Sequence, residues 1–234
     1  MSKSHLKRIN VPRTWDVKRK DNVFITRPKP AGHKLKFSLP LIVVFRDMLG
    51  KVKTTKELEF VLNNKEVYLN GKKAYSPKQA VGLMDVIRLP EIKEYYRIVI
   101  NNAGVLGYVQ IDEKESTKLP ILLKNKAKLK SGKTQLNFTN GYCMLVDKDN
   151  YKTGDMLIYD FLQKKIIDHI TLEKGAAVYF TSGKNIGETA TLEEINDNSL
   201  ICKKDDKTFE IDRRSAKDYL FLVGKEAPAI KLAD

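Results

Sequence analysis

The 234-residue sequence is poor in the residues that build metal and redox sites. It has two cysteines, Cys143 and Cys202, and three histidines, with no CxxC pair and no spacing typical of zinc ligands. We therefore expect two free, buried thiols in a reducing, cytoplasmic setting, and no metal or other cofactor.

Long hydrophobic runs and nucleotide-binding glycine motifs are also missing. Apolar runs such as Leu41–Phe45 are far too short to cross a bilayer, and charged residues rather than an apolar core follow Lys3 and Lys7, so neither a membrane span nor a signal peptide is expected. No GxGxxG follows an expected strand, and no GxxxxGK[ST] occurs. Acidic pairs such as Glu193-Glu194 lie in polar surroundings, so we expect no catalytic carboxylate and no small-molecule substrate.

Positive charge, in contrast, is abundant and unevenly placed. The formal net charge is +14, and residues 1–40 hold seven lysines and four arginines against only two aspartates, a local balance of +9. Such a surface attracts polyanions, of which nucleic acid is the commonest in a cell. The same stretch contains four prolines and few apolar residues, so residues 1–38 should form a basic arm that is extended when alone.

We expect the arm to bind phosphates through its cations and to use its aromatic residues at the same surface. Trp15 and Phe24 could each stack on a base or fill a protein pocket, and the sequence leaves these alternatives open. His5 and His33 should be mostly neutral, and each either donates a hydrogen bond to phosphate or ribose or is a surface histidine without a role. The candidate RNA-binding residues of the arm are His5, Lys7, Arg8, Arg13, Trp15, Lys18, Arg19, Lys20, Arg27, Lys29, His33, Lys34 and Lys36.

Residues 39–90 are expected to form a small module of two helices and a hairpin. Apolar spacing predicts a helix over 41–48 that Gly50 can end, and Thr54 with Glu57 predicts a capping box for a second helix that ends near Asn63. Strands at 67–69 and 85–89 follow, with a tight turn at 70–71 after the first. Further candidate RNA contacts on this module are Arg46, Lys51, Lys53, Lys56 and Lys65.

The rest of the chain is predicted to be β-structure. A central β domain, residues 91–171, should contain strands at 95–101, 105–111, 121–123, 135–138, 144–146, 156–161 and 166–171. A last β unit, residues 172–224, should contain strands at 176–180, 189–195, 199–203, 208–211 and 219–223, followed by a loose tail at 225–234. Its loop 183–187 holds Lys184 and Asn185 between glycines, and this loop either binds phosphate through its amides or is only a tight connection.

Four segments, in order, carry a resemblance to a known family. The first is basic and proline-rich: it contains His5-Leu6-Lys7-Arg8, Pro12, Trp15, Pro28, Pro30 and His33-Lys34-Leu35 and runs into Leu39-Pro40-Leu41 and Arg46. The others are Val67-Tyr68-Leu69-Asn70-Gly71-Lys72 through Asp85-Val86-Ile87, then Gly183-Lys184-Asn185-Ile186-Gly187, and finally Phe221-Leu222-Val223-Gly224-Lys225. Over nearly its whole length the chain resembles the archaeal and eukaryotic type of protein four of the small ribosomal subunit.

The resemblance implies an α+β, mostly β, multidomain fold: the basic arm, an α-L RNA-binding module, the central β domain and a KOW-like SH3-type β-barrel. It also implies a structural protein that binds small-subunit ribosomal RNA beside neighbouring ribosomal proteins in the cytoplasm, and that is not a homo-oligomer. Two alternatives stay open: an RNA-modifying enzyme, since α-L modules also accompany such catalytic domains, and a transcription or translation factor that uses a KOW-type unit.

Overall fold

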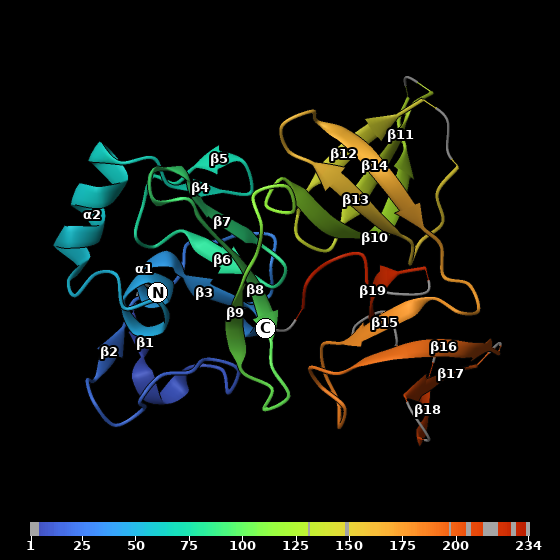
Figure 1. Ribbon diagram of the computed structural model, residues 1–234, viewed down its shortest axis with the longest axis horizontal. Coiled ribbons are helices and arrows are strands. Elements are labelled where there is room, and N and C mark those ends of the chain that lie inside the picture. The colour runs from blue at the N-terminus through green and yellow to red at the C-terminus, as the bar shows by residue number, and fades with distance from the viewer. Residues whose placement is uncertain are drawn as a thin grey trace. The chain divides into compact units, whose positions relative to one another are not determined.

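The computed structural model describes residues 5–130, 132–147, 150–196, 198–204, 207–212, 220–225 and 228–232. The chain forms two compact units, the first comprising residues 1–100 and 105–117 and the second residues 101–104 and 118–234. Both units are mostly β, with few helices (Figure 1), which agrees with the predicted fold class at this level of detail.

The helices of the first unit begin where the sequence predicts them. Helix α1 (Leu41–Val43) continues as a π-helical turn over Val44–Met48, and Gly50 follows at a φ of +64°. Helix α2 (Thr55–Asn64) begins with a complete capping box, in which the Thr54 hydroxyl accepts a hydrogen bond from the Glu57 amide and the Glu57 carboxylate accepts one from the Thr54 amide. The capping box is therefore confirmed.

The strands of the first unit form one five-stranded sheet and two small pairs. Antiparallel strands in the order β5-β4-β7-β8-β9 make the sheet, β3 pairs with β6, and β1 pairs with β2. Their bounds are β1 (Leu6–Lys7), β2 (Phe24–Ile25), β3 (Ser38–Pro40), β4 (Tyr68–Leu69), β5 (Lys72–Lys73), β6 (Ala80–Gly82), β7 (Val86–Leu89), β8 (Glu94–Ile100) and β9 (Leu106–Gln110).

Two features of this sheet bear on the sequence predictions. The turn between β4 and β5 has positive φ at both Asn70 (49°) and Gly71 (73°), as a tight hairpin requires. Strand β8 pairs with β7 on one side and with β9 on the other, so β8 and β9 extend the sheet of the first unit beyond residue 90. The hairpin they form was predicted within the central β domain.

The arm is folded against the rest of the first unit. Besides the β1–β2 pair, it contains short 3-10 turns at Arg8–Asn10 and Leu35–Phe37. Val11, Trp15 and Ile25 are buried, and the Leu106 amide donates a 2.7 Å hydrogen bond to the Thr14 carbonyl. These contacts supply the apolar burial that the arm lacks by itself, so the extended conformation expected for the isolated arm is replaced by a compact one.

The second unit contains two five-stranded antiparallel sheets, ordered β12-β11-β10-β13-β14 and β18-β17-β16-β15-β19. Tyr219, at which we predict the last strand to begin, lies outside the described residues, as do residues 226–227 and 233–234 of the predicted tail. The bounds are β10 (Lys118–Lys128), β11 (Thr134–Phe138), β12 (Cys143–Val146), β13 (Met156–Asp160), β14 (Lys165–Ile170), β15 (Ala177–Phe180), β16 (Thr189–Ile195), β17 (Ser199–Lys204), β18 (Lys207–Asp212) and β19 (Leu220–Gly224).

The two cysteines are free, but only one is buried. Cys202 is fully buried on β17, and burial raises the pKa of its thiol to about 11. Cys143 is exposed, so the prediction of two buried thiols is wrong for this residue.

Candidate nucleic-acid interface

Two arginines of the arm hold the arm's own fold together. The buried Arg8 donates through Nη1 to the Lys18 carbonyl at 2.7 Å and to the Asp21 carboxylate at 3.3 Å. The Arg19 guanidinium donates to three backbone carbonyls at 3.1–3.2 Å, those of Ile9, Val11 and Pro12. Because its guanidinium is buried, the predicted role of Arg8 as a phosphate contact is corrected to a structural one, and the bonds of Arg19 give it a structural role too.

Trp15 is an internal packing residue. Only 3% of it is exposed, and its indole N–H donates to the Leu35 carbonyl at 3.4 Å. The face of its ring is therefore closed to a base, and the predicted RNA contact is corrected in favour of the packing alternative.

His33 is directed into the protein rather than toward solvent. Its Nε2 lies 3.2 Å from the carboxylate of the buried Asp85, which also accepts hydrogen bonds from the Asn70 side chain at 2.7 Å and the Gly82 amide at 2.6 Å. Burial lowers the pKa of His33, but the charge of Asp85 and its hydrogen bond together outweigh burial, so the pKa is raised. The expectation that His33 is aimed at RNA is corrected, because its imidazole is held by Asp85.

Position 82 in this cluster requires glycine. A β-carbon on Gly82 would lie 2.2 Å from the imidazole ring of His33. The histidine thus joins the arm to β6 and to the loop before β7 by close packing as well as by charge.

The other cations of the arm lie at the surface. No ion pair joins the charged groups of Lys7, Arg13 or Lys20 to any residue that the structure describes, and all three are exposed. Lys29 lies with Nζ 4.8 Å from the centre of the Tyr75 ring, and Lys36 with Nζ 5.1 Å from that of Phe37. His5, Lys18 and Lys34 are exposed, and Arg27 is half-buried.

The cations predicted on residues 39–90 are largely matched by carboxylates. Arg46 pairs with Asp47 at 2.9 Å, Lys65 pairs with Glu91 at 2.6 Å, and Lys51 pairs with Glu94. Hydrogen bonds from Lys65 and from Lys51 lower the pKa of Glu91 and of Glu94, respectively, so both carboxylates stay charged. Only Lys53 and Lys56 of this set have no ion pair among the residues that the structure describes.

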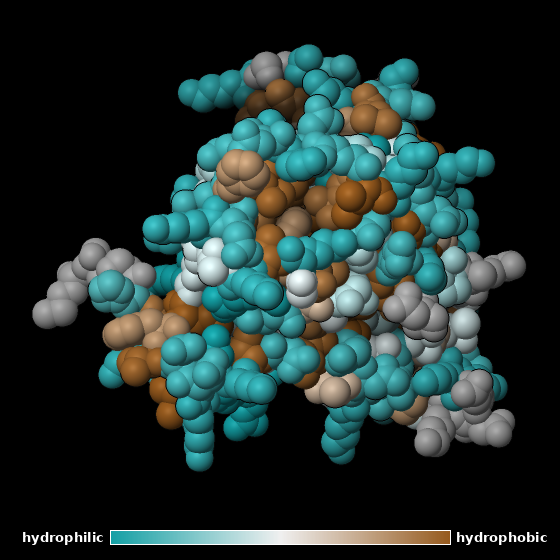
Figure 2. Space-filling model, turned by 60° about the vertical axis from the view of Figure 1, so that its left-hand side comes forward, coloured by the Kyte–Doolittle hydropathy of each residue, from teal (hydrophilic) through white to brown (hydrophobic). Residues whose placement is uncertain are grey.

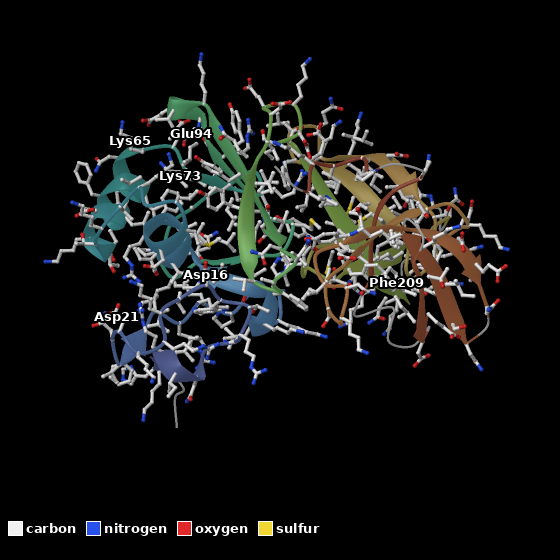
Figure 3. The ribbon with its side chains drawn as sticks, turned by 60° about the horizontal axis from the view of Figure 1, so that its bottom comes forward. Asp16, Asp21, Lys65, Lys73, Glu94 and Phe209 are labelled. Atoms are coloured by element: carbon white, nitrogen blue, oxygen red, sulfur yellow. The ribbon has the colours of Figure 1, made fainter. Side chains whose placement is uncertain are left out.

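The paired cations and the arm occupy different parts of the first unit. Figure 3 shows Lys65 and Glu94 well separated from Asp21 in the arm. On the face of the molecule in Figure 2, hydrophobic areas are small and bordered by hydrophilic side chains. The arm thus carries unmatched positive charge away from the paired cations of residues 39–90.

The loop 183–187 is shaped by packing within the second unit. Gly187 has a φ of +81°, and a β-carbon there would lie 2.4 Å from the carbonyl carbon of Asn101. Lys184 is exposed and Asn185 is half-buried, while the adjacent Glu188 pairs with Lys204 at 3.2 Å. Close backbone approach therefore accounts for the second glycine of the loop.

One basic residue near the arm was missed by sequence reasoning. Lys78 lies in the loop before β6, and its carbonyl accepts a 2.7 Å hydrogen bond from the Lys29 amide, which brings the two lysines to one surface. Nothing local in the sequence signals a contact between residues so far apart. Among the described residues, no cluster of side chains could hold a metal ion, and no helix is long and apolar enough to span a membrane.

Comparison with known proteins identifies the family. The profile described as Ribosomal family S4e matches residues 92–166, and the RS4NT (NUC023) domain matches residues 2–36. The small ribosomal subunit protein eS4 of Methanosphaera stadtmanae is 35% identical over 99% of this chain and 96% of its own length. The chain belongs to the eS4 family. The eS4 protein of Methanocaldococcus jannaschii is 34% identical over 98% of both chains.

A solved structure extends the eS4 likeness to the fold. The crystal structure of the 30S ribosomal protein S4e from Thermoplasma acidophilum superposes with a TM-score of 0.68 at 26% identity, covering 84% of this chain and 98% of that one. The family predicted from the four sequence segments is confirmed. The RS4NT match spans nearly all of the basic arm.

Proposed function

We propose that the chain is a structural constituent of the small ribosomal subunit in the cytoplasm, where it binds ribosomal RNA and contacts neighbouring ribosomal proteins. It supports translation as part of the particle and is not an enzyme. Membership of the eS4 family supports this function, because the relatives that match over nearly their full length are named small ribosomal subunit proteins.

The observation that carries the RNA-binding part of the proposal is the contrast between two groups of cations. The exposed cations Lys7, Arg13 and Lys20 of the arm have no carboxylate partner among the described residues, whereas Arg46, Lys51 and Lys65 are each matched by one. A phosphate must compete with the existing carboxylate at a paired cation, but releases only counterions at an unpaired one. The arm is therefore the principal contact with RNA.

The same proposal assigns a role to each part of the chain. Residues 39–90 act as an α-L RNA-binding module, residues 91–171 as a central β domain, and residues 172–224 as a KOW-like barrel between the arm (1–38) and the tail (225–234). The capped helix α2 followed by the β4–β5 hairpin supports the first assignment. The five-stranded antiparallel sheet that contains β15–β19 supports the last.

Sedimentation tests this proposal against the alternatives. In an extract separated on a sucrose gradient in high salt, the chain should migrate with small subunits. Recovery at the top of the gradient, with free proteins, would identify a soluble factor or an enzyme instead. In a second test the purified chain should bind ribosomal RNA near physiological ionic strength, and failure to bind would refute the RNA-binding part.

A further inference from the structure

The arm encloses a groove that the phosphate-binding role does not explain. The groove has a volume of about 870 Å³ and lies within the first unit, between the arm segment from Phe24 to Ala31, the pair His5 and Leu6, and Lys78. Small-molecule and cofactor sites have volumes of roughly 300–1,000 Å³, so this groove can hold a ligand of nucleotide size.

The ionisable side chains that line the groove are all basic. Arg27, Lys29 and Lys78 line it together with His5 and His33, and no aspartate or glutamate occurs among the described residues of the lining. The backbone hydrogen bond between Lys29 and Lys78 joins the two sides of the groove. The ion pair with Asp85 holds His33, another lining residue, in place, so the groove is part of the folded arm.

An exposed aromatic ring, that of Phe24, also lines the groove. Phe24 is 56% exposed, and its ring centre lies 5.5 Å from that of His5. It lies opposite Lys7 in the β1–β2 pair, where directly opposite side chains share a face. An exposed phenylalanine opposite a lysine provides the two elements of a single-stranded nucleic-acid site, a stacking surface and countercharge for the backbone.

We propose that this groove binds an unpaired nucleotide of ribosomal RNA, with the base stacked on Phe24 and the adjoining phosphates held by Arg27, Lys29 and Lys78. This inference rests on the proposed function and names the form of RNA that the arm recognises. In an A-form duplex the bases are paired and stacked on one another, so their faces are closed to a side chain. A bulged or single-stranded nucleotide exposes its base and fits the groove.

The test uses the full chain and a six-nucleotide single-stranded RNA that carries 2-aminopurine, with a duplex of the same length as the paired reference. The protein should bind the single strand more tightly than the duplex and quench the 2-aminopurine fluorescence, because stacking quenches it. Phe24→Ala should weaken single-strand binding by about tenfold with an unchanged salt dependence, since stacking releases no counterions. Phe24→Tyr should restore the affinity.

Two matched variants complete the experiment. Tyr108→Ala removes a ring on β9 that is 38% exposed and lies outside both the groove and residues 39–90, and it should leave the affinity unchanged. Lys29→Gln should weaken binding and also reduce the salt slope by about 0.7, the value for one phosphate of a single strand.

The possible failures are distinguishable. If Phe24→Ala binds the single strand as wild type does, or if the duplex binds as tightly as the single strand, the groove is not a nucleotide site although the proposed function stands. If the wild type binds no RNA at near-physiological salt, the RNA-binding part of the proposed function itself fails.

Discussion

Neutralising three cations of the arm should change RNA binding in a way that neutralising three paired cations does not. The first variant replaces Lys7, Arg13 and Lys20 by glutamine. The control replaces Arg46, Lys51 and Lys65 by glutamine, and so removes the same three positive charges from cations that already have carboxylate partners.

The size of the difference follows from counterion release. Each phosphate neutralised contributes about 0.7 to 0.9 to the slope of log K against log salt, so loss of three contacts should reduce the slope by about 2 to 3. A fourfold rise in salt would then weaken the wild type about 15 to 60 times more than the arm variant. The control should change the slope by less than about 1, because its cations must leave their carboxylates before they can bind phosphate.

The measurement is a titration of the purified full-length variants with small-subunit ribosomal RNA at several salt concentrations, after thermal unfolding has shown that each variant is folded. Equal slope changes in the two variants would refute the reasoning, because net charge rather than position would then control binding. Complete deletion of the arm is a poorer test, since it also removes the buried Trp15.

Three further predictions concern the interior. The fluorescence of Trp15, the single tryptophan, should be blue-shifted and change little when RNA is added, and strong quenching would contradict its burial. Gly183→Ala should lower the free energy of unfolding by about 1–2 kcal/mol through backbone strain alone. Gly187→Ala should lower it by about 1–3 kcal/mol more, because the added β-carbon would also clash with backbone atoms. Equal losses of stability in thermal unfolding would exclude this steric contribution. The pKa of His33 is raised above 6.5, so its ion pair contributes stability in full below that pH and loses it as the pH rises through the folded-state pKa. In urea unfolding, the free energy of unfolding should therefore fall between about pH 5.5 and about pH 8.5, and this fall should be smaller in His33→Gln. The same pH dependence in the wild type and the variant would argue against the ion pair.

Local signals in the sequence were sufficient for the helices and for most of the longer strands, but not for the short strands β1, β2, β3 and β6. The capping box at Thr54 and Glu57 involves residues three apart, and the Asn70-Gly71 turn depends only on the φ angles that these residues accept. Most predicted strands are present within one or two residues of their expected ends, because alternation or a short apolar run marks each strand by itself.

Long-range contacts could not be predicted from local patterns in the sequence. The β3–β6 pair joins Ser38–Pro40 to Ala80–Gly82, and each strand is too short to have a pattern. The partners of Lys51 and Lys65 lie 43 and 26 residues away, so the sequence could not show that these cations are matched. The burial of Trp15 likewise depends on a surface built by distant residues, which is why the choice between packing and stacking stayed open until the fold was known.

The hydrogen bonds of Arg8 and Arg19 bear on how the protein joins its RNA. These bonds shape the arm before any RNA is present, so the conformational entropy of ordering it is lost during folding rather than during binding. Association should accordingly have the small heat-capacity change of two preformed surfaces, not the large negative one of coupled folding and binding. A protein of this kind can recognise its place in a ribosomal particle as soon as the RNA site has formed.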